Sequence, residues 1–288
     1  MSYLDHIRAC NNLDLSRFVP FEVAGSRVGW IRRDNIGYLA DRQDVFQFDG
    51  SRIAVLSTLD TFENRTSAVA EVVRELSVNG IIPEPRDEVY PVAKGDSRPP
   101  FLVVERSAIP FFGVRASGVH MNGYVRLSDG LHMWVARRAH DKMTYPGMLD
   151  NMVAGGQPHG LGFRENMIKE CGEEAGIPER IAENVTPVGF IDYAHESADG
   201  AKPDRQYCYD LELPQDFVPV IVDGEVDEFM LWPLARVAEV VRETGDFKFN
   251  CNLVIINFLI RHGFLDPDTE PDYVEICSGL HCRGNLFS

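Results

Sequence analysis

Three glutamates, Glu170, Glu173 and Glu174, stand close together past the middle of the chain. Spacings of three and four residues place side chains on one face of an α-helix, so these carboxylates are expected to converge. Carboxylates held this close repel one another unless a cation lies among them. Mg²⁺ is such a cation, because it binds carboxylate oxygens and keeps positions open for the phosphates of a substrate. The spacing therefore predicts a metal site that acts on a phosphorylated compound.

The residues around these glutamates predict the helix that carries them. Ile168, Cys171 and Ala175 fall at helical spacing on the opposite face, so the helix can bury one side and present the acidic one. Gly176 follows where glycine commonly ends a helix. A solvated acidic face without a metal is the alternative interpretation.

Two further groups are candidates for binding the substrate. The densest basic patch of this acidic chain includes Arg137 and Arg138, which we expect to face the anionic groups of the substrate. Solvated loop charge is the alternative for this patch. Gly155 and Gly156 open the glycine-rich loop before the acidic helix, and we expect the substrate to contact them as well.

Composition limits the class of protein. The length of 288 residues suggests two domains, at roughly 100 to 200 residues per domain. A formal charge of −16 argues against nucleic acid or an anionic membrane as a partner. No apolar run approaches the ~20 residues that span a bilayer. The first residues lack the basic start and apolar core of a secretory signal.

The six cysteines are scattered without a paired pattern, which indicates reduced thiols and a cytoplasmic location. Cys277 and Cys282 flank His281, but no second pair of ligands accompanies them. That ligand count disfavours a structural zinc site.

Apolar periodicity and turn residues divide the chain into two domains and a tail. We predict a smaller α+β domain over residues 1–115, a sheet with helices on both sides over 116–265, and a tail over 266–288. The expected elements are a helix at 61–79, a strand at 102–105 that continues through 108–114, a hairpin of 119–126 and 132–138, strands at 188–195 and 206–213 around a polar loop at 196–205, a strand at 229–232, and helices at 234–244 and 250–262.

The stretch from Gly155 to Ile177 resembles the Nudix box, whose pattern is Gly, five residues, Glu, seven residues, Arg-Glu-hydrophobic-x-Glu-Glu-x-Gly-hydrophobic. The opening glycine, the three glutamates and the closing Gly-Ile pair fall in register. Leu161 stands in place of the first Glu, and Lys169 in place of the Arg. The resemblance implies an α/β fold, the Nudix α/β/α sandwich with a mixed sheet. It also implies hydrolysis of a diphosphate bond with Mg²⁺ or Mn²⁺ held by the three glutamates.

The same resemblance implies roles for two more residues. Lys169 would orient the carboxylates as the arginine of the box does, or pair with Glu173 one helical turn later. A general base would come from one of the glutamates or from a loop carboxylate, for which Glu225 in the acidic segment before residue 229 is the candidate.

A wider resemblance covers nearly the whole chain. The N-terminal region, the Val-Ala-Gly-Gly-Gln-Pro-His-Gly-Leu run and the Phe-Leu-Ile-Arg-His-Gly-Phe run look like a Nudix subgroup with a thiamine-pyrophosphokinase-related N-terminal domain. In this subgroup the first Glu of the box is typically absent, as at Leu161. The resemblance implies hydrolysis of thiamine diphosphate, especially its oxidised forms, to the monophosphate.

Two alternatives remain at this point. ADP-ribose or another nucleoside diphosphate compound is an alternative substrate, and a non-catalytic binding module is an alternative class. Isopentenyl diphosphate isomerase shares the fold, but the run from Asn151 to Pro158 lacks the catalytic cysteine expected there. A homodimer is compatible with the sequence, which gives no oligomeric state.

Overall fold

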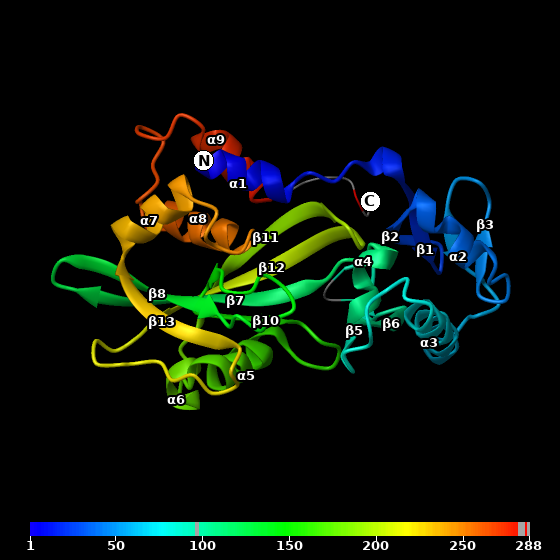
Figure 1. Ribbon diagram of the computed structural model, residues 1–288, viewed down its shortest axis with the longest axis horizontal. Coiled ribbons are helices and arrows are strands. Elements are labelled where there is room, and N and C mark those ends of the chain that lie inside the picture. The colour runs from blue at the N-terminus through cyan, green and yellow to red at the C-terminus, as the bar shows by residue number, and fades with distance from the viewer. Residues whose placement is uncertain (96–97, 282–285, 287–288) are drawn as a thin grey trace.

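The computed structural model describes residues 1–95, 98–281 and 286 (Figure 1). Its largest feature is a seven-stranded mixed sheet in the order β11-β12-β7-β8-β13, with β10 beside β7 and β9 beside β8. Strands β7 and β12 pair in parallel, and the other neighbours are antiparallel. The strands are β7 (Ser117–Leu127), β8 (Gly130–Arg138), β9 (Leu149–Asp150), β10 (Val153–Gly156), β11 (Thr186–Ser197), β12 (Gly200–Glu212) and β13 (Val226–Pro233).

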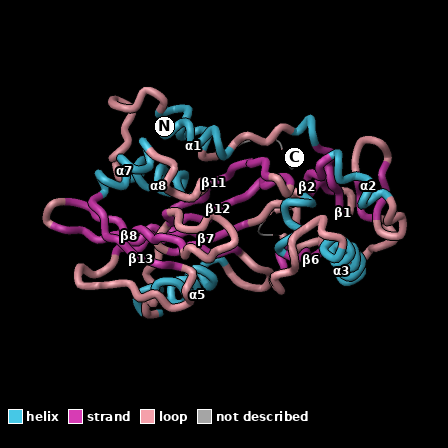
Figure 2. Tube along the Cα trace, in the orientation of Figure 1, coloured by secondary structure: helices cyan, strands magenta, loops and turns pink. Residues whose placement is uncertain are grey.

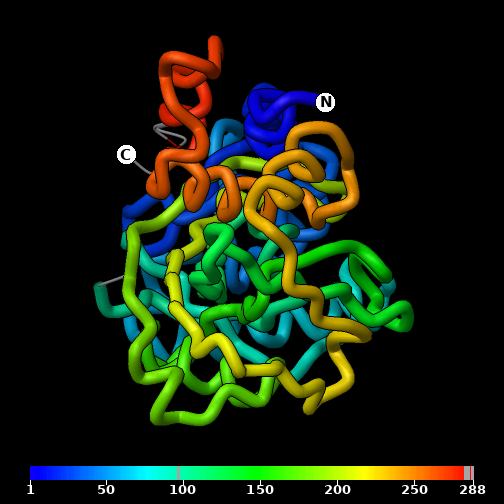
Figure 3. The backbone as a smooth tube through the Cα atoms, turned by 90° about the vertical axis from the view of Figure 1, so that its left-hand side faces the viewer, coloured from blue at the N-terminus to red at the C-terminus, as the bar shows by residue number. Residues whose placement is uncertain are grey.

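Helices cover both faces of this sheet because its strands bury side chains on both sides (Figures 2 and 3). One face of β7 packs Val119 and Met121 into a core with Met167 of α5 (Phe163–Ala175). The short helix α6 (Glu179–Ala182) follows α5 on this side. The other face packs against α7 (Leu234–Glu243) and α8 (Cys251–Arg261). This arrangement confirms the predicted α/β sandwich with a mixed sheet.

A smaller α+β region precedes the sandwich and lies at one end of it (Figure 1). It contains a four-stranded sheet in the order β2-β1-β4-β3 and a two-stranded sheet of β5 and β6. Its elements are β1 (Phe18–Val23), β2 (Ser26–Arg32), α2 (Ile36–Ala40), β3 (Phe46–Phe48), β4 (Ile53–Val55), α3 (Phe62–Val78), β5 (Val89–Val92), β6 (Leu102–Glu105) and α4 (Ile109–Phe112), with short 3-10 helices at Leu15–Arg17, Arg33–Asn35 and Arg106–Ala108.

The first and last helices pack together on the sandwich. Tyr3 and Ile7 of α1 (Tyr3–Cys10) share a core with Phe258 of α8 and Ile276 of α9 (Tyr273–Gly279). The chain therefore begins on the larger region and then crosses to the smaller one. The division at residues 115 and 265 stays a prediction. No helix in the described part of the chain is both long and apolar enough to cross a membrane.

Two sequence predictions of local structure are wrong. Residues 196–205 do not form a polar loop, because β11 runs to Ser197 and β12 starts at Gly200. Some of the polar residues that suggested a loop have partners in the fold: Arg205 pairs with Asp192 across the two strands, and Glu196 pairs with Arg17 and Arg32. Residues 108–114 do not extend the preceding strand, because Ile109–Phe112 forms α4, which ends at Gly113 in the left-handed region with φ of 56°.

Candidate active site

Helix α5 fixes the carboxylates by burying its other side. Met167, Cys171 and Ala175 are fully buried beneath the sheet. Gly176 ends the helix with a φ of 60°, a conformation that glycine adopts without steric cost. The helix confirms the predicted element and its C-terminal stop.

Glu174 is the most buried of the three glutamates, with 9% of its surface exposed. Its Oε2 accepts a hydrogen bond of 2.9 Å from the backbone N–H of Ala154 on β10. Burial raises the pKa of Glu174 well above its usual value, and the charges of Asp150, Glu170 and Glu225 raise it further. The strand thus anchors Glu174, which forms no ion pair within the described part of the chain.

Glu170 lies against β10 because Gly155 has no side chain. A Cβ at Gly155 would lie 2.4 Å from the Glu170 Cδ, which is closer than real Cβ contacts allow. Burial raises the pKa of Glu170, and the charges of Glu173 and Glu225 add to the shift while Lys169 opposes it. The first glycine of the loop thus provides space for a carboxylate.

Lys169 and Glu173 occupy the exposed edge of the cluster. The Lys169 Nζ donates to Glu173 Oε2 at i+4 and lies 3.6 Å from Glu170 Oε1. The Glu173 side chain is 51% exposed. The pairing of Lys169 with Glu173 is present, and the same ammonium also contacts Glu170, while its role in orienting the carboxylates stays a prediction.

Glu225 lies near this cluster although it is distant in sequence. We call the small pocket lined by Arg138, Asp150, Ala154, Glu174 and Glu225 the carboxylate pocket. Glu225 stands just before β13, and its Oε2 lies 2.5 Å from Lys142 Nζ. The structure therefore brings Glu170, Glu174 and Glu225 together, while Glu173 stands at the rim.

The two candidate arginines make different contacts. Arg138 donates to Asp150 Oδ2 at 2.8 Å and to the carbonyls of Thr144 and Tyr145. Its side chain lines the carboxylate pocket but is held by these partners. Arg137 donates to the Gly147 carbonyl at 3.2 Å and lies 3.5 Å from Glu228. Both arginines brace the loop between β8 and β9 in this structure.

A second buried cluster was not found by sequence reasoning. Ligand atoms of His120, Asp150 and Cys251 lie within 4.8 Å of one another. The Cys251 Sγ donates to Asp150 Oδ1 at 2.6 Å, and Lys248 Nζ lies 3.7 Å from Asp150 Oδ2. Asp150 ends β9 and Cys251 begins α8, so these residues are far apart in sequence and come together only in the folded chain. The zinc site that the sequence disfavoured at Cys277, His281 and Cys282 includes Cys282, which lies outside the described residues.

The chemistry of the α5 cluster fits a divalent cation. Glu170 and Glu174 both have raised pKa values, because burial and mutual repulsion disfavour their charged forms. A cation held between them would restore the charged forms and leave positions for phosphate oxygens. The Asp150 cluster is a weaker fit, because Arg138 and Lys248 already supply positive charge there.

A family model and several solved structures each match part of this chain. Residues 2–116 match a family model described as a domain of unknown function, DUF4743. Among solved structures, the Nudix domain of Shewanella oneidensis NrtR bound to ADP-ribose is 14% identical, with a TM-score of 0.42 over 52% of this chain and 90% of that one. The Deinococcus radiodurans protein DR0079 is 20% identical, with a TM-score of 0.41 over 62% of this chain and 100% of that one.

Curated relatives share far more of the sequence. Nudix hydrolase 24, chloroplastic, of Arabidopsis thaliana is 44% identical over 95% of this chain and 76% of its own length. Nudix hydrolase 20, chloroplastic, of the same plant is 44% identical over 98% of this chain and 78% of its own length. An uncharacterized protein of Saccharomyces cerevisiae is 34% identical over 84% of this chain. The chain therefore belongs to the Nudix hydrolase family, enzymes that cleave pyrophosphate bonds and generally use divalent metal ions.

Proposed function

We propose that this protein is a Mg²⁺-dependent diphosphatase whose metal is held by Glu170 and Glu174, with Glu173 at the exposed edge. The observation that carries this proposal is the convergence of Glu170, Glu174 and Glu225, in which burial and mutual repulsion still raise the pKa values of Glu170 and Glu174. A bound divalent ion would neutralise charge on the phosphate oxygens and lower the pKa of a water molecule.

The residues of the chain position these carboxylates before any ligand arrives. The Ala154 N–H fixes one oxygen of Glu174, and the missing side chain of Gly155 admits Glu170. Lys169 joins Glu170 to Glu173, as the arginine of the box would. Such preorganisation lowers the reorganisation needed when charge develops on the reacting phosphate.

Glu225 is our candidate for the general base. The Lys142 ammonium lies 2.5 Å from its Oε2 and holds the carboxylate in position beside the carboxylate pocket. The Glu225 carbonyl accepts from the Ala139 N–H at 2.9 Å, which ties its backbone to the end of β8. Replacing Glu225 by Gln should lower kcat by about 10²–10⁴-fold, the usual contribution of a positioned base.

We propose an oxidised form of thiamine diphosphate as the substrate, with the monophosphate and phosphate as products. Support comes from the resemblance of the N-terminal region to the thiamine-pyrophosphokinase-related subgroup, and from Leu161 at the first glutamate position of the box. A cytoplasmic location is part of the same proposal. The described cysteines are all free, which suits a reducing compartment.

The test is cleavage of the diphosphate bond, measured by chromatography of the monophosphate products, in a panel of oxidised and intact thiamine diphosphate, ADP-ribose and nucleoside diphosphates, with Mg²⁺ or with a chelator. We expect Mg²⁺-dependent cleavage of the oxidised thiamine compound above all others. Glu179→Gln, which changes an exposed glutamate on α6, is the matched control for changes on α5. Turnover of nucleotide compounds alone would overturn the substrate. Binding without turnover of any compound would indicate a non-catalytic module.

A further inference from the structure

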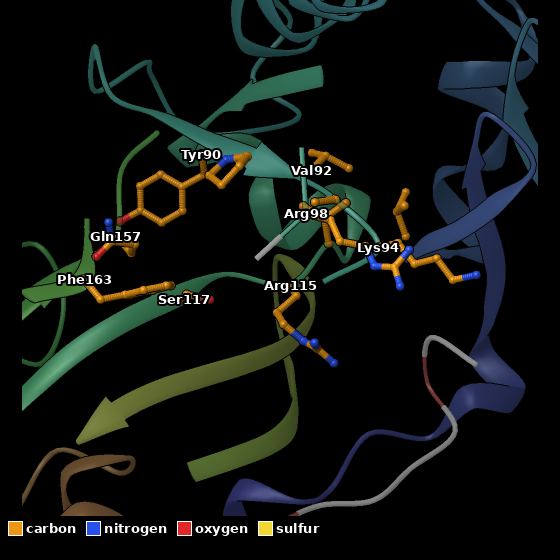
Figure 4. Close-up of a pocket in the computed structure, with 12 residues that line it drawn as sticks. Tyr90, Val92, Lys94, Arg98, Arg115, Ser117, Gln157 and Phe163 are labelled. Carbon is orange, nitrogen blue, oxygen red and sulfur yellow. The ribbon is translucent and has the colours of Figure 1, made fainter. Parts of the chain in front are cut away.

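The N-terminal region contacts the glycine-rich loop beside the proposed metal site. The His159 N–H donates to the Val89 carbonyl of β5 at 2.9 Å, and the centroids of the His159 and Phe62 rings lie 6.1 Å apart. The next residue of β5, Tyr90, lines a pocket together with Gln157, and Figure 4 shows the tyrosine ring directed towards that part of the loop. Two consecutive residues of β5 thus lie against the loop.

Tyr90 and Gly156 fit together closely. A Cβ at Gly156 would lie 1.7 Å from the Tyr90 hydroxyl oxygen and 3.0 Å from the ring carbon that carries it. The hydroxyl therefore occupies the space that any side chain at position 156 would need. The tyrosine is 4% exposed and belongs to the apolar core of the N-terminal region, so its ring cannot turn away from the loop without opening a cavity in that core.

The acidic helix holds the same glycine from within the sandwich. Asn166 of α5 is fully buried, and its Nδ2 donates to the Gly156 carbonyl at 2.7 Å and to Gln157 Oε1 at 3.2 Å. Gly156 also pairs with Gly118 of β7 in the sheet. Its backbone is therefore held by α5 and β7, and Tyr90 fills the space in front of its Cα.

The two residues before Gly156 contact the proposed metal ligands. The Ala154 N–H donates to Glu174, and the missing side chain of Gly155 leaves room for Glu170. Because successive peptide units are rigid and share a Cα atom, a displacement of Gly156 moves both of these residues with it. A displacement of about 1 Å in a catalytic site can lower activity about 10²-fold. The contact at Gly156 is therefore coupled to the geometry of both carboxylates.

We propose that Tyr90 is a positioning residue of the metal site, and that the N-terminal region sets the geometry of Glu170 and Glu174 through it. The inference rests on the proposed function, which assigns the metal to these carboxylates. Tyr90 acts through the backbone of Gly156 and binds no metal itself. The N-terminal region is then a structural part of the active site, and the sandwich without this contact holds the metal more weakly.

The first test compares two substitutions in the core of the N-terminal region. Tyr90→Leu removes the hydroxyl and the ring that hold Gly156, whereas Phe46→Leu makes a similar change where the ring packs on Phe21 and Phe112. Dissociation constants for Mg²⁺ alone are measured by calorimetry on the full chain, without substrate. We expect Tyr90→Leu to raise this constant about tenfold, as the loss of groups that orient metal ligands does, and Phe46→Leu to leave it unchanged.

The second test uses the close fit of Tyr90 and Gly156 and leaves the core filled. Gly156→Ala places a methyl group on the Tyr90 hydroxyl and should raise the Mg²⁺ dissociation constant about tenfold. Adding Tyr90→Phe removes the hydroxyl and leaves 3.0 Å to the nearest ring carbon, which small shifts accommodate. The double variant should therefore bind Mg²⁺ nearly as wild type does, a coupling that residues out of contact do not show.

Three results would overturn the inference: equal constants for Tyr90→Leu and Phe46→Leu, wild-type binding in Gly156→Ala, or a double variant that binds as weakly as Gly156→Ala. A wild-type protein that binds no Mg²⁺ would overturn the proposed function, and this inference with it. The two failures are distinct, because the first leaves Mg²⁺ binding by wild type intact.

Discussion

Two buried carboxylates line the carboxylate pocket, and their pKa values shift in opposite directions. Glu174 is 9% exposed and Asp150 is 5% exposed. Burial raises the pKa of Glu174 well above its usual value. Burial by itself would also raise the pKa of Asp150, but the charges of Lys248 and Arg138 and a hydrogen bond from Cys251 lower this pKa to about 2. Both carboxylates line the same pocket, so the opposite pKa shifts come from the charged groups that each one contacts.

This contrast distinguishes a carboxylate that stabilises the fold, Asp150, from the carboxylates proposed to bind a metal. Burial and the charge of Lys248 lower the pKa of His120 to about 4, so this ring is neutral at pH 7 and the cations beside Asp150 are Lys248 and Arg138. Asp150 is thus a compensated group that holds β9 to α8. Glu174 forms no ion pair within the described residues, and Glu170 contacts only the partly exposed Lys169, so retaining both buried carboxylates costs stability unless a cation binds.

The largest expected effect is on catalysis. Glu170→Gln keeps the size of the side chain but removes a proposed metal ligand, so kcat/KM should fall by about 10³-fold, the several kcal/mol of transition-state stabilisation that a bound metal supplies. Steady-state phosphate release at saturating Mg²⁺ measures the loss. Activity within a few-fold of wild type would show that Glu170 does not hold the metal.

The next effect is on stability and concerns the compensated group. Asp150→Asn leaves Lys248 and Arg138 without their shared carboxylate, and breaking a buried pair in this way costs about 3–5 kcal/mol. Urea unfolding monitored by circular dichroism measures the change. Asp216→Asn, at an exposed position, should change stability by less than about 0.5 kcal/mol. Equal stabilities of the two variants would contradict the structural role of Asp150.

A third carboxylate extends the comparison to pH. Burial raises the pKa of Asp204 to about 6, although Lys202 and a 3.3 Å hydrogen bond from Tyr193 oppose the shift. The folded state therefore binds this proton more tightly than the unfolded state, and the contribution of Asp204 to stability falls as pH rises from about 4 to about 6.

Asp204→Asn removes this titration. The unfolding free energy of the variant minus that of wild type should increase by about 2–3 kcal/mol from pH 4 to pH 7, because only wild type loses the contribution of the bound proton. Urea unfolding at both values measures the difference. A difference that does not depend on pH would mean that Asp204 titrates normally.

The smallest effect distinguishes two glycines of the same region. Gly155→Ala places a Cβ where Glu170 lies, so it should cost about 1–3 kcal/mol of stability and reduce activity. Gly172→Ala meets no atom within 4 Å inside α5 and should stabilise the helix by up to about 1 kcal/mol. Thermal unfolding and phosphate release distinguish the two variants. Equal thermal midpoints and equal activities would contradict the position of Glu170 against Gly155.

The sequence predicted what depends on local pattern. The acidic helix, its glycine stop and the hairpin before it follow from periodicity and turn residues, and the structure confirms them. Whether a carboxylate is compensated depends on residues far apart in sequence. Asp150 meets Cys251 across 101 positions, and Tyr90 fills the space at Gly156 from another region. Spacing in the sequence does not predict such contacts, so the cluster around Asp150 and the contact of Tyr90 with Gly156 are seen only in the folded structure.

The polar strands show the same limit at smaller scale. Residues 196–205 look like a loop because their charges are unpaired in sequence, whereas pairing of β11 with β12 gives those charges partners. Helix α5 shows the reverse case, since its pattern predicted a helix but not the contact of its Glu174 with the backbone of β10. Side-chain character predicts an element more reliably than it predicts the element's neighbours.

Unfolding of wild type and Glu174→Gln, in chelator and in excess Mg²⁺, tests the central claim most directly. In chelator the variant should be at least as stable as wild type, because Gln keeps the acceptor for the Ala154 N–H and removes an uncompensated buried charge. Mg²⁺ should then raise the thermal midpoint of wild type only, since a ligand stabilises the state that binds it. A variant that is less stable in chelator, and stabilised by Mg²⁺ as much as wild type, would contradict the account.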